Sequence, residues 1–171
     1  MSTESHNSHT AALALELPES VLKELEKKAK SEDVSMECII ADAIMVYLGL
    51  NDPKTKAEIH IKLSQKYFRE ADELLKKEDF VQASEKAWGA VSQLMKAVAA
   101  RKGIELRSHS ELHKFVTELV TETDDKEIRR LWQSAGMLHQ NFYENWLPKE
   151  MVIANIEDVK ELVKKLKLLT D

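Results

Sequence analysis

The 171-residue sequence contains few of the residues that break up or cross-link a chain: four glycines, three prolines and one cysteine. So few turn residues argue against a many-stranded β protein, which needs a turn about every ten residues, and favour long helices. The single cysteine, Cys38, cannot form an internal disulfide, and no secretory leader pattern opens the sequence. We therefore predict an all-α protein that resides in the cytoplasm.

No charge of one sign dominates the chain, and no apolar run is long enough to span a membrane. There are 25 basic and 30 acidic residues, giving a formal charge of -5, and hydrophobic residues make up 43% of the sequence. These values are typical of a globular chain that buries a core. The slight acidic excess disfavours wrapping of duplex DNA or binding of a membrane surface through a basic patch. Neither DNA nor a membrane is an expected partner.

The first 51 residues divide into a short arm and a small unit. Residues 1–10 are rich in Ser, Thr and His without periodicity and predict a disordered arm. Leucines alternate with other residues over 11–17, which is typical of one half-buried strand. Pro18 begins a helix, and a second helix lies between Ser35, a predicted N-cap, and Gly49, a predicted C-terminal stop. Residues 11–51 thus predict a strand-helix-helix unit, similar in outline to a ribbon-helix-helix unit.

A ribbon-helix-helix dimer binds DNA by inserting its two strands into the major groove. If the leucines of this strand face inward, the outward residues are Ala12, Ala14 and Glu16, and none of them donates a hydrogen bond to a base edge. We expect the strand to pair with a second copy or to dock on the rest of the chain, because an unpaired edge is unfavourable. A transcriptional regulator is the second alternative function.

Residues 52–171 carry the signals of five helices. These begin at Pro53, after an Asp79 cap, at the Ser108–Glu111 capping box, at Asp124 and near Pro148. In the last helix, apolar residues repeat at spacings of four and three from Val152 to Leu166, a narrow seam that suits either a core groove or a partner helix. We predict an antiparallel five-helix bundle and, from this seam and the unpaired strand, a homodimer.

Metal and nucleophilic chemistry have little support. His109 and His113 are one helical turn apart, but no third ligand is specified and the glutamate of a zinc-protease motif is missing. Cys38 lies in an apolar run without a basic neighbour, which indicates a buried structural thiol. The four glycines form no phosphate-binding loop pattern. We predict no catalytic residue, no metal ligand and no cofactor.

Two helical stretches, 82–90 and 138–144, combine core-like apolar residues with polar ones. His139 falls on an apolar stripe and needs a polar partner if it is buried, and Glu85 or Lys86 on a facing helix would provide one. If the two helices pack side by side, their polar residues converge on a pocket. The candidate ligand-binding residues are Glu85, Lys86, Trp88, His139, Asn141 and Tyr143.

Each of these side chains suits a distinct role in such a pocket. Lys86 would attract an anion, His139 would donate or accept a hydrogen bond, and Asn141 would orient a ligand through its amide. Trp88 and Tyr143 would provide flat apolar contacts. In the alternative interpretation His139 is satisfied within the core, the aromatic rings fill space, and the charged residues lie on a solvated face.

The stretch from Gln82 to Ala90, together with Leu138-His139 and Asn141–Glu144, resembles the archaeal PaREP family over roughly Pro53–Leu169. That family is similar in fold to the HEPN superfamily (higher eukaryote and prokaryote nucleotide-binding), whose antiparallel helical bundles commonly dimerise. The resemblance implies an archaeal source and a HEPN-like bundle. Our first hypothesis is a non-enzymatic protein that binds a nucleotide, a nucleic acid or a protein partner through the pocket between the helices of Trp88 and His139.

The alternative that the resemblance implies is a metal-independent ribonuclease of the toxin type. HEPN ribonucleases carry an arginine and a histidine on a helix with four to six residues between them. Arg107 and His113 have a permissible spacing, but Arg107 precedes the predicted helix. When the chain is aligned on Asn141 instead, the two positions are Gln140 and Asn145, which supply neither a cation nor proton transfer. Enzymatic activity therefore stays open, with binding favoured.

Overall fold

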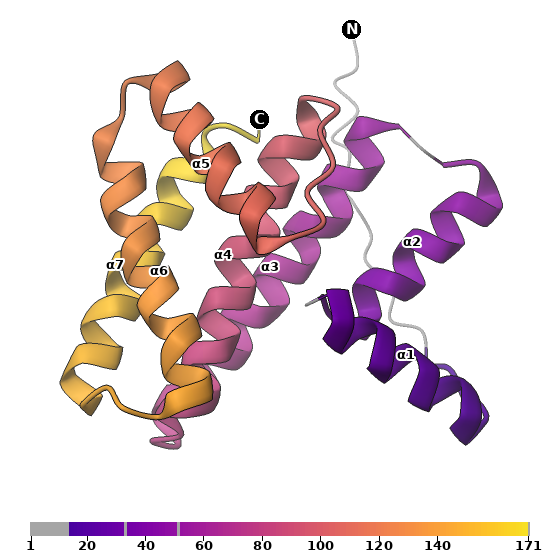
Figure 1. Cartoon of the computed structure of the whole chain (residues 1–171), viewed down its shortest axis with the longest axis horizontal. Coiled ribbons are helices and arrows are strands. Elements are labelled where there is room, and N and C mark those ends of the chain that lie inside the picture. The colour runs from indigo at the N-terminus through magenta and orange to yellow at the C-terminus, as the bar shows by residue number, and fades with distance from the viewer. Residues whose placement is uncertain (1–13, 33, 51, 171) are drawn as a thin grey trace, which may run out of the picture.

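The computed structural model describes residues 14–32, 34–50 and 52–170, and over these ranges the regular structure is entirely helical (Figure 1). The helices are α1 (Glu19–Glu32), α2 (Met36–Leu48), α3 (Pro53–Lys76), α4 (Phe80–Arg101), α5 (His109–Thr123), α6 (Lys126–Glu144) and α7 (Lys149–Lys167). The all-α prediction is confirmed. Within the described ranges, no helix has the length and apolar composition that a membrane span requires.

The helix ends lie close to the capping residues of the sequence. The side chain of Ser35 accepts a hydrogen bond from the backbone of Cys38, and Gly49 ends α2 with a φ of 68° in the left-handed region that glycine adopts without strain. Ser108 and Glu111 form the complete capping box of α5.

One predicted helix start is wrong by a residue. Asp124 does not cap α6, because it ends α5 in the left-handed conformation with a φ of 51°. The next residue, Asp125, is the N-cap and accepts a hydrogen bond from the backbone of Glu127 at 3.0 Å. Two adjacent aspartates therefore share the tasks of ending one helix and beginning the next.

The predicted strand over residues 11–17 is not confirmed. Residues 14–18 belong to no helix or strand, and residues 11–13 lie outside the described residues, as does the predicted arm of residues 1–10. A strand requires a neighbour for its backbone hydrogen bonds, and the described part of a single copy contains no other strand. The division of the chain after residue 51 stays a prediction.

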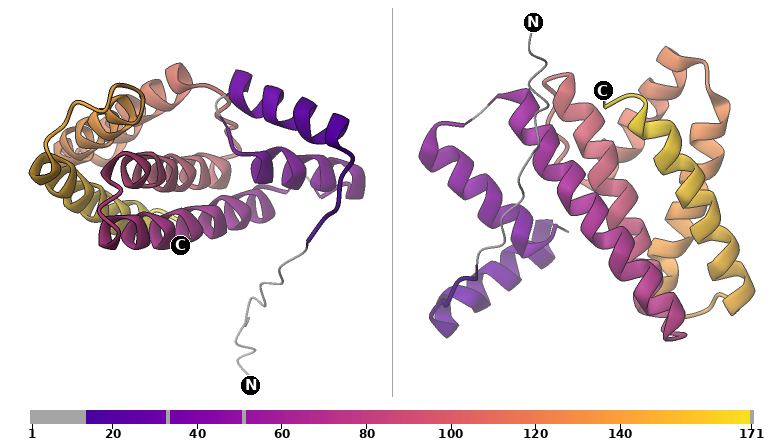
Figure 2. Two further views of the ribbon diagram at one scale, coloured as in Figure 1. Left: turned by 90° about the horizontal axis from the view of Figure 1, so that it is seen from below. Right: turned by 180° about the vertical axis from the view of Figure 1, so that it is seen from behind.

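Helix α4 is the centre of the molecule. Fifteen of its 22 residues are buried, including every residue from Ala90 to Ala100. Helix α3 packs along one side of α4, and α5, α6 and α7 contact α4 on its remaining sides (Figure 2). The α1–α2 hairpin lies beyond α3 and α4, on the side away from α6 and α7. A helix surrounded in this way must accommodate each polar side chain within the protein or at a cavity.

The regular seam of α7 belongs to this core. Its residues Val152, Ile156, Val159, Val163 and Leu166 are all buried. Of the two uses that the spacing allowed, the structure therefore shows the core groove. A homodimer can no longer be argued from this seam.

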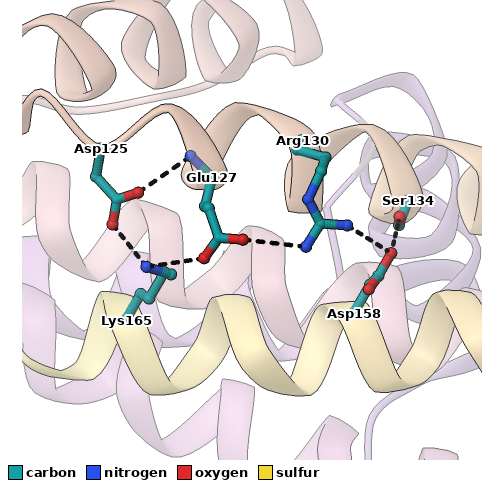
Figure 3. Close-up of polar contacts among 6 residues, drawn as sticks. All are labelled: Asp125, Glu127, Arg130, Ser134, Asp158 and Lys165. Atoms are coloured by element: carbon teal, nitrogen blue, oxygen red, sulfur yellow. Dashed lines mark hydrogen bonds and ion pairs between the residues drawn. The ribbon is translucent and has the colours of Figure 1, made fainter.

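Helices α6 and α7 are also joined by a ladder of charged groups (Figure 3). The ammonium of Lys165 lies 2.7 Å from Asp125 and 3.4 Å from Glu127. Arg130 lies 3.4 Å from Glu127 and 3.6 Å from Asp158, which also accepts a hydrogen bond from the Ser134 hydroxyl. The hydrogen bond from Lys165 holds the pKa of Asp125 below its ordinary value of 3.8. The N-cap of α6 is thereby tied to the last turns of α7.

We expect Lys165→Met to lower the urea midpoint of unfolding at neutral pH. Because the pKa of Asp125 is lower in the folded chain than in the unfolded one, its contribution is present above pH 3.8 and is lost on acidification through the folded pKa. The difference from the unmutated chain should shrink as the pH falls below 3.8. Lys164→Met is the matched control, because Lys164 pairs only with Glu161 on the exposed surface of the same helix. Equal effects of the two variants, or a difference independent of pH, would contradict the ladder.

Candidate functional site

A cavity of about 200 Å³ lies where α4 passes α6. The first turn of α5, the middle of α3 and the residues at the start of α2 complete its walls. Its lining residues are Val34, Ser35, Glu37, Tyr67, Glu85, Lys86, Trp88, Gly89, Ser92, Gln93, Lys96, His109, Leu112, His139, Phe142 and Tyr143. Five of the six predicted site residues are among them, and Asn141 is not.

An aromatic cluster forms one end of this cavity. The rings of Trp88 and His139 stack with centroids 4.7 Å apart, which places α4 and α6 side by side as the pocket hypothesis requires. Tyr143 meets the edge of His139 at 5.2 Å. His109 contacts both Trp88 and His139, at 5.4 Å and 4.6 Å. The cluster thus offers one indole, two imidazoles and one phenol within reach of a flat ligand.

The second histidine of α5 supports the cluster from behind. The indole of Trp132 donates a hydrogen bond to Nδ1 of His113 at 3.0 Å, so this nitrogen carries no proton. Trp132 in turn lies 5.0 Å from Trp88 between ring centroids. His113 does not line the cavity. Among the described residues, no group of three His, Cys, Asp or Glu side chains is arranged to hold a metal ion.

Paired charges occupy the rim next to α3. The ammonium of Lys86 lies 2.9 Å from Glu70 and 5.1 Å from the centroid of the Tyr67 ring. Lys66 lies 2.5 Å from Glu37. Burial alone would raise the pKa of Glu37, but the hydrogen bond from Lys66 and its charge outweigh this effect and lower it. Both lysines are therefore engaged by carboxylates.

Gly89 allows α3 to approach α4 at this rim. A Cβ atom at position 89 would lie 3.2 Å from Cδ2 of Tyr67, closer than ordinary van der Waals contact. The Tyr67 ring therefore lies directly against the α4 backbone, and its burial raises the pKa of its hydroxyl. The absence of a side chain at Gly89 therefore permits this close approach of α3 to α4.

Lys96 on α4 also lines the cavity. It is 7% exposed, and in the described part of the chain its ammonium forms no hydrogen bond or ion pair. The neighbouring Ser92 hydroxyl is likewise buried without a hydrogen-bond partner among these residues. Burying a charge is costly unless it is paired. Ser92 and Lys96 therefore face the cavity without a hydrogen-bond partner among the described residues, and Lys96 interacts only electrostatically with Asp42 there.

Gln93, between them in the sequence, has hydrogen-bond partners within the protein. Its Oε1 accepts a hydrogen bond from Nδ1 of His60 at 2.7 Å and one from the Cys38 thiol at 3.5 Å. Burial lowers the pKa of His60 and raises that of Cys38, so burial favours the uncharged form of each. This network fixes the first turn of α2 on α3 and α4.

A second cavity of about 300 Å³ lies on the other side of this network, and Lys96 lines both cavities. Asp42 and Glu105 are acidic lining residues of the second cavity. Glu105 pairs with Arg107 at 3.0 Å, and burial raises the pKa of Asp42. Neither forms an ion pair with Lys96 in the described structure.

Asn141 has a structural position instead of facing the cavity. It is 1% exposed; its amide nitrogen donates to the Ser84 hydroxyl, and its oxygen accepts from the backbones of Trp146 and Leu147. It therefore satisfies the turn between α6 and α7.

Sequence reasoning passed over Lys96 as a site residue. The signal for Lys96 was available: it follows Gln93 by three residues on the same helical face, and it is a lone charge between Met95 and Ala97 in an apolar run. His109 was considered only as a metal ligand, because nothing local to α5 indicates that its first turn lies against α4.

Comparison with known families supports the resemblance. The model of the archaeal PaREP1/PaREP8 family matches residues 59–163, which is more than half of the chain and includes α4, α5 and α6. No curated protein and no solved structure matches the chain.

We expect Asn141→Ala to lower the free energy of unfolding by about 2–4 kcal/mol, because two backbone N–H groups lose their acceptor and the Ser84 hydroxyl, which still donates to Phe80, loses a donor. The matched control is Gln140→Ala on the exposed side of α6, whose side chain bonds only Glu144. It should change the unfolding energy by less than about 0.5 kcal/mol. Urea unfolding at neutral pH measures both. Similar losses in the two variants would contradict the structural role of Asn141.

Proposed function

The chain belongs to the archaeal PaREP1/PaREP8 family, and we propose that it is a nucleotide-binding protein whose ligand occupies the cavity between α4 and α6. The proposal covers binding without catalysis. The observation that carries it is Lys96, a lysine 7% exposed that lines the cavity and forms no ion pair in the described structure.

An anionic group of the ligand would supply the missing partner of Lys96. Phosphate oxygens accept strong charge-assisted hydrogen bonds from an ammonium, and such bonds strengthen where water is excluded. The hydroxyl of Ser92 adds a neutral donor one helical turn away. Lys86 and Lys66 would take a lesser part, because Glu70 and Glu37 already neutralise them.

The opposite end of the cavity suits a nucleobase. His139 and Tyr143 present ring edges and faces, and Trp88 holds His139 in place by stacking. Stacking of a base on aromatic side chains contributes about 1–3 kcal/mol. Glu85 of α4 also lines the cavity and can accept hydrogen bonds from the exocyclic amine of a base. A mononucleotide carries both required parts, a flat ring and an anion.

The HEPN-like arrangement of the bundle is part of this proposal. An antiparallel helical bundle with its candidate site between two helices is compatible with that superfamily, whose name refers to nucleotide binding. No specific observation favours the ribonuclease alternative. Arg107 is paired with Glu105 beside the second cavity, and Nδ1 of His113 accepts the Trp132 hydrogen bond.

We expect AMP to bind the unmutated chain in isothermal titration calorimetry and to bind Lys96→Met at least about tenfold more weakly, a difference of about 1.4 kcal/mol. Removing a buried charge that has no partner should leave the fold as stable or more stable, so weaker binding would not reflect unfolding. Lys149→Met is the matched control, because Lys149 is exposed and lines neither cavity.

Titrations with adenosine and with inorganic phosphate measure the binding of the two halves of AMP separately. The affinity for adenosine should be the same in Lys96→Met as in the unmutated chain, and phosphate binding should be lost. Equal AMP affinity in Lys96→Met and the unmutated chain would overturn the proposal. It would also be overturned if the unmutated chain bound none of the three compounds at millimolar concentration.

A further inference from the structure

Helix α2 is apolar on all sides but is largely uncovered. Eleven of its thirteen residues are apolar, the exceptions being Glu37 and Asp42, yet only Cys38 and Met45 are buried. Tyr47 is 89% exposed and Val46 69%. A helix that is hydrophobic around its whole circumference is normally buried. Something outside the described chain must therefore cover it.

Helix α1 is also left uncovered by the rest of the described chain. None of its residues is buried, although Val21 and Leu22 are apolar. Its polar side carries exposed ion pairs within the helix, such as Lys23 with Glu19, which contribute little to stability. An isolated helix of this length is marginal in water. The hairpin thus presents two helices that each lack a cover.

Eight of the fifteen large hydrophobic residues that are exposed in the described structure belong to residues 15–50, which include the α1–α2 hairpin. They are Leu15, Val21, Leu22, Ile44, Val46, Tyr47, Leu48 and Leu50. At roughly 100 Å² each, these side chains expose about 800 Å² in total, which is comparable to one partner's share of a standard interface.

We propose that a second copy of this chain covers the hairpin, with α1 of each copy packed on α2 of the other about a two-fold axis. A symmetric pairing covers both helices at once, because α1 of each copy lies on the uncovered apolar surface of α2 of the other. Helix α1 has no buried residue, so it needs a partner surface in every folded molecule. A second copy of the same chain is a partner that is available wherever the protein is made. This inference does not depend on nucleotide binding.

One consequence joins the interface to the candidate site and rests on the proposed function. Ser35 and Glu37, at the start of α2, line the cavity, and Cys38 bonds Gln93. The helix that forms the interface therefore also forms a wall of the ligand site. Dilution into the monomeric state should weaken AMP binding, because the wall loses its support.

Sedimentation equilibrium without nucleotide tests the interface itself. The unmutated chain should be a dimer at micromolar concentration, and Tyr47→Glu should raise the dimer dissociation constant at least about tenfold. The matched control is Ile153→Glu, an exposed apolar position on α7, which should remain dimeric. A monomeric unmutated chain at about 100 µM would overturn the proposal, and so would a dimer that Tyr47→Glu leaves intact.

Hydrogen exchange of the unmutated chain gives a second measurement that needs no variant to fold. Amides of α1 and α2 should gain protection as the protein concentration rises, whereas those of α4 should not change. Protection of α1 that is independent of concentration would contradict a second copy as its cover. Because neither experiment contains nucleotide, a failure of AMP binding would leave their results unaffected.

Discussion

The burial of α4 on all sides is the constraint on which the rest of the structure depends. Every polar group that this helix carries must be matched inside the protein or must face a cavity. Ser84 is matched by Asn141, and Gln93 by His60 and Cys38. Within the described residues, Ser92 and Lys96 have no such match, and both face the same cavity. The proposed ligand site is thus the place where the internal pairing of α4 is incomplete.

The surrounding helices give this place its shape. Stacking of Trp88 on His139 sets α6 against α4, and the capping box of α5 positions His109 at the same cluster. Gly89 lets Tyr67 close the side next to α3. The start of α2 completes the walls, although most of that helix lies outside the core. The start of α2 therefore takes part both in the proposed ligand site and in the helix that forms the proposed dimer interface.

Local signals predicted much of the fold, because caps and apolar spacing act over a few residues. Ser35, Gly49 and the Ser108–Glu111 box mark helix ends in both sequence and structure. The convergence of Trp88 and His139 was also predictable from their positions on apolar stripes. Asn141 lies on the same helix as His139, and the sequence suggested a ligand-binding role for it. Its partners are the distant Ser84 and the backbone of the turn after α6, and residue spacing does not reveal either contact. Whether Lys96 has a partner depends on the residues of several helices that surround it, so its own position in the sequence could not show it.

A strand over residues 11–17 would need a second strand as its neighbour, and the described part of one copy contains none.

A crystal structure of the chain grown with AMP tests the central claim most directly. The account predicts a phosphate oxygen within hydrogen-bond distance of the Lys96 ammonium, with the adenine against His139 and Tyr143. A phosphate bound elsewhere, or an ammonium of Lys96 paired with Asp42 or Glu105 and no nucleotide in the cavity, would contradict it.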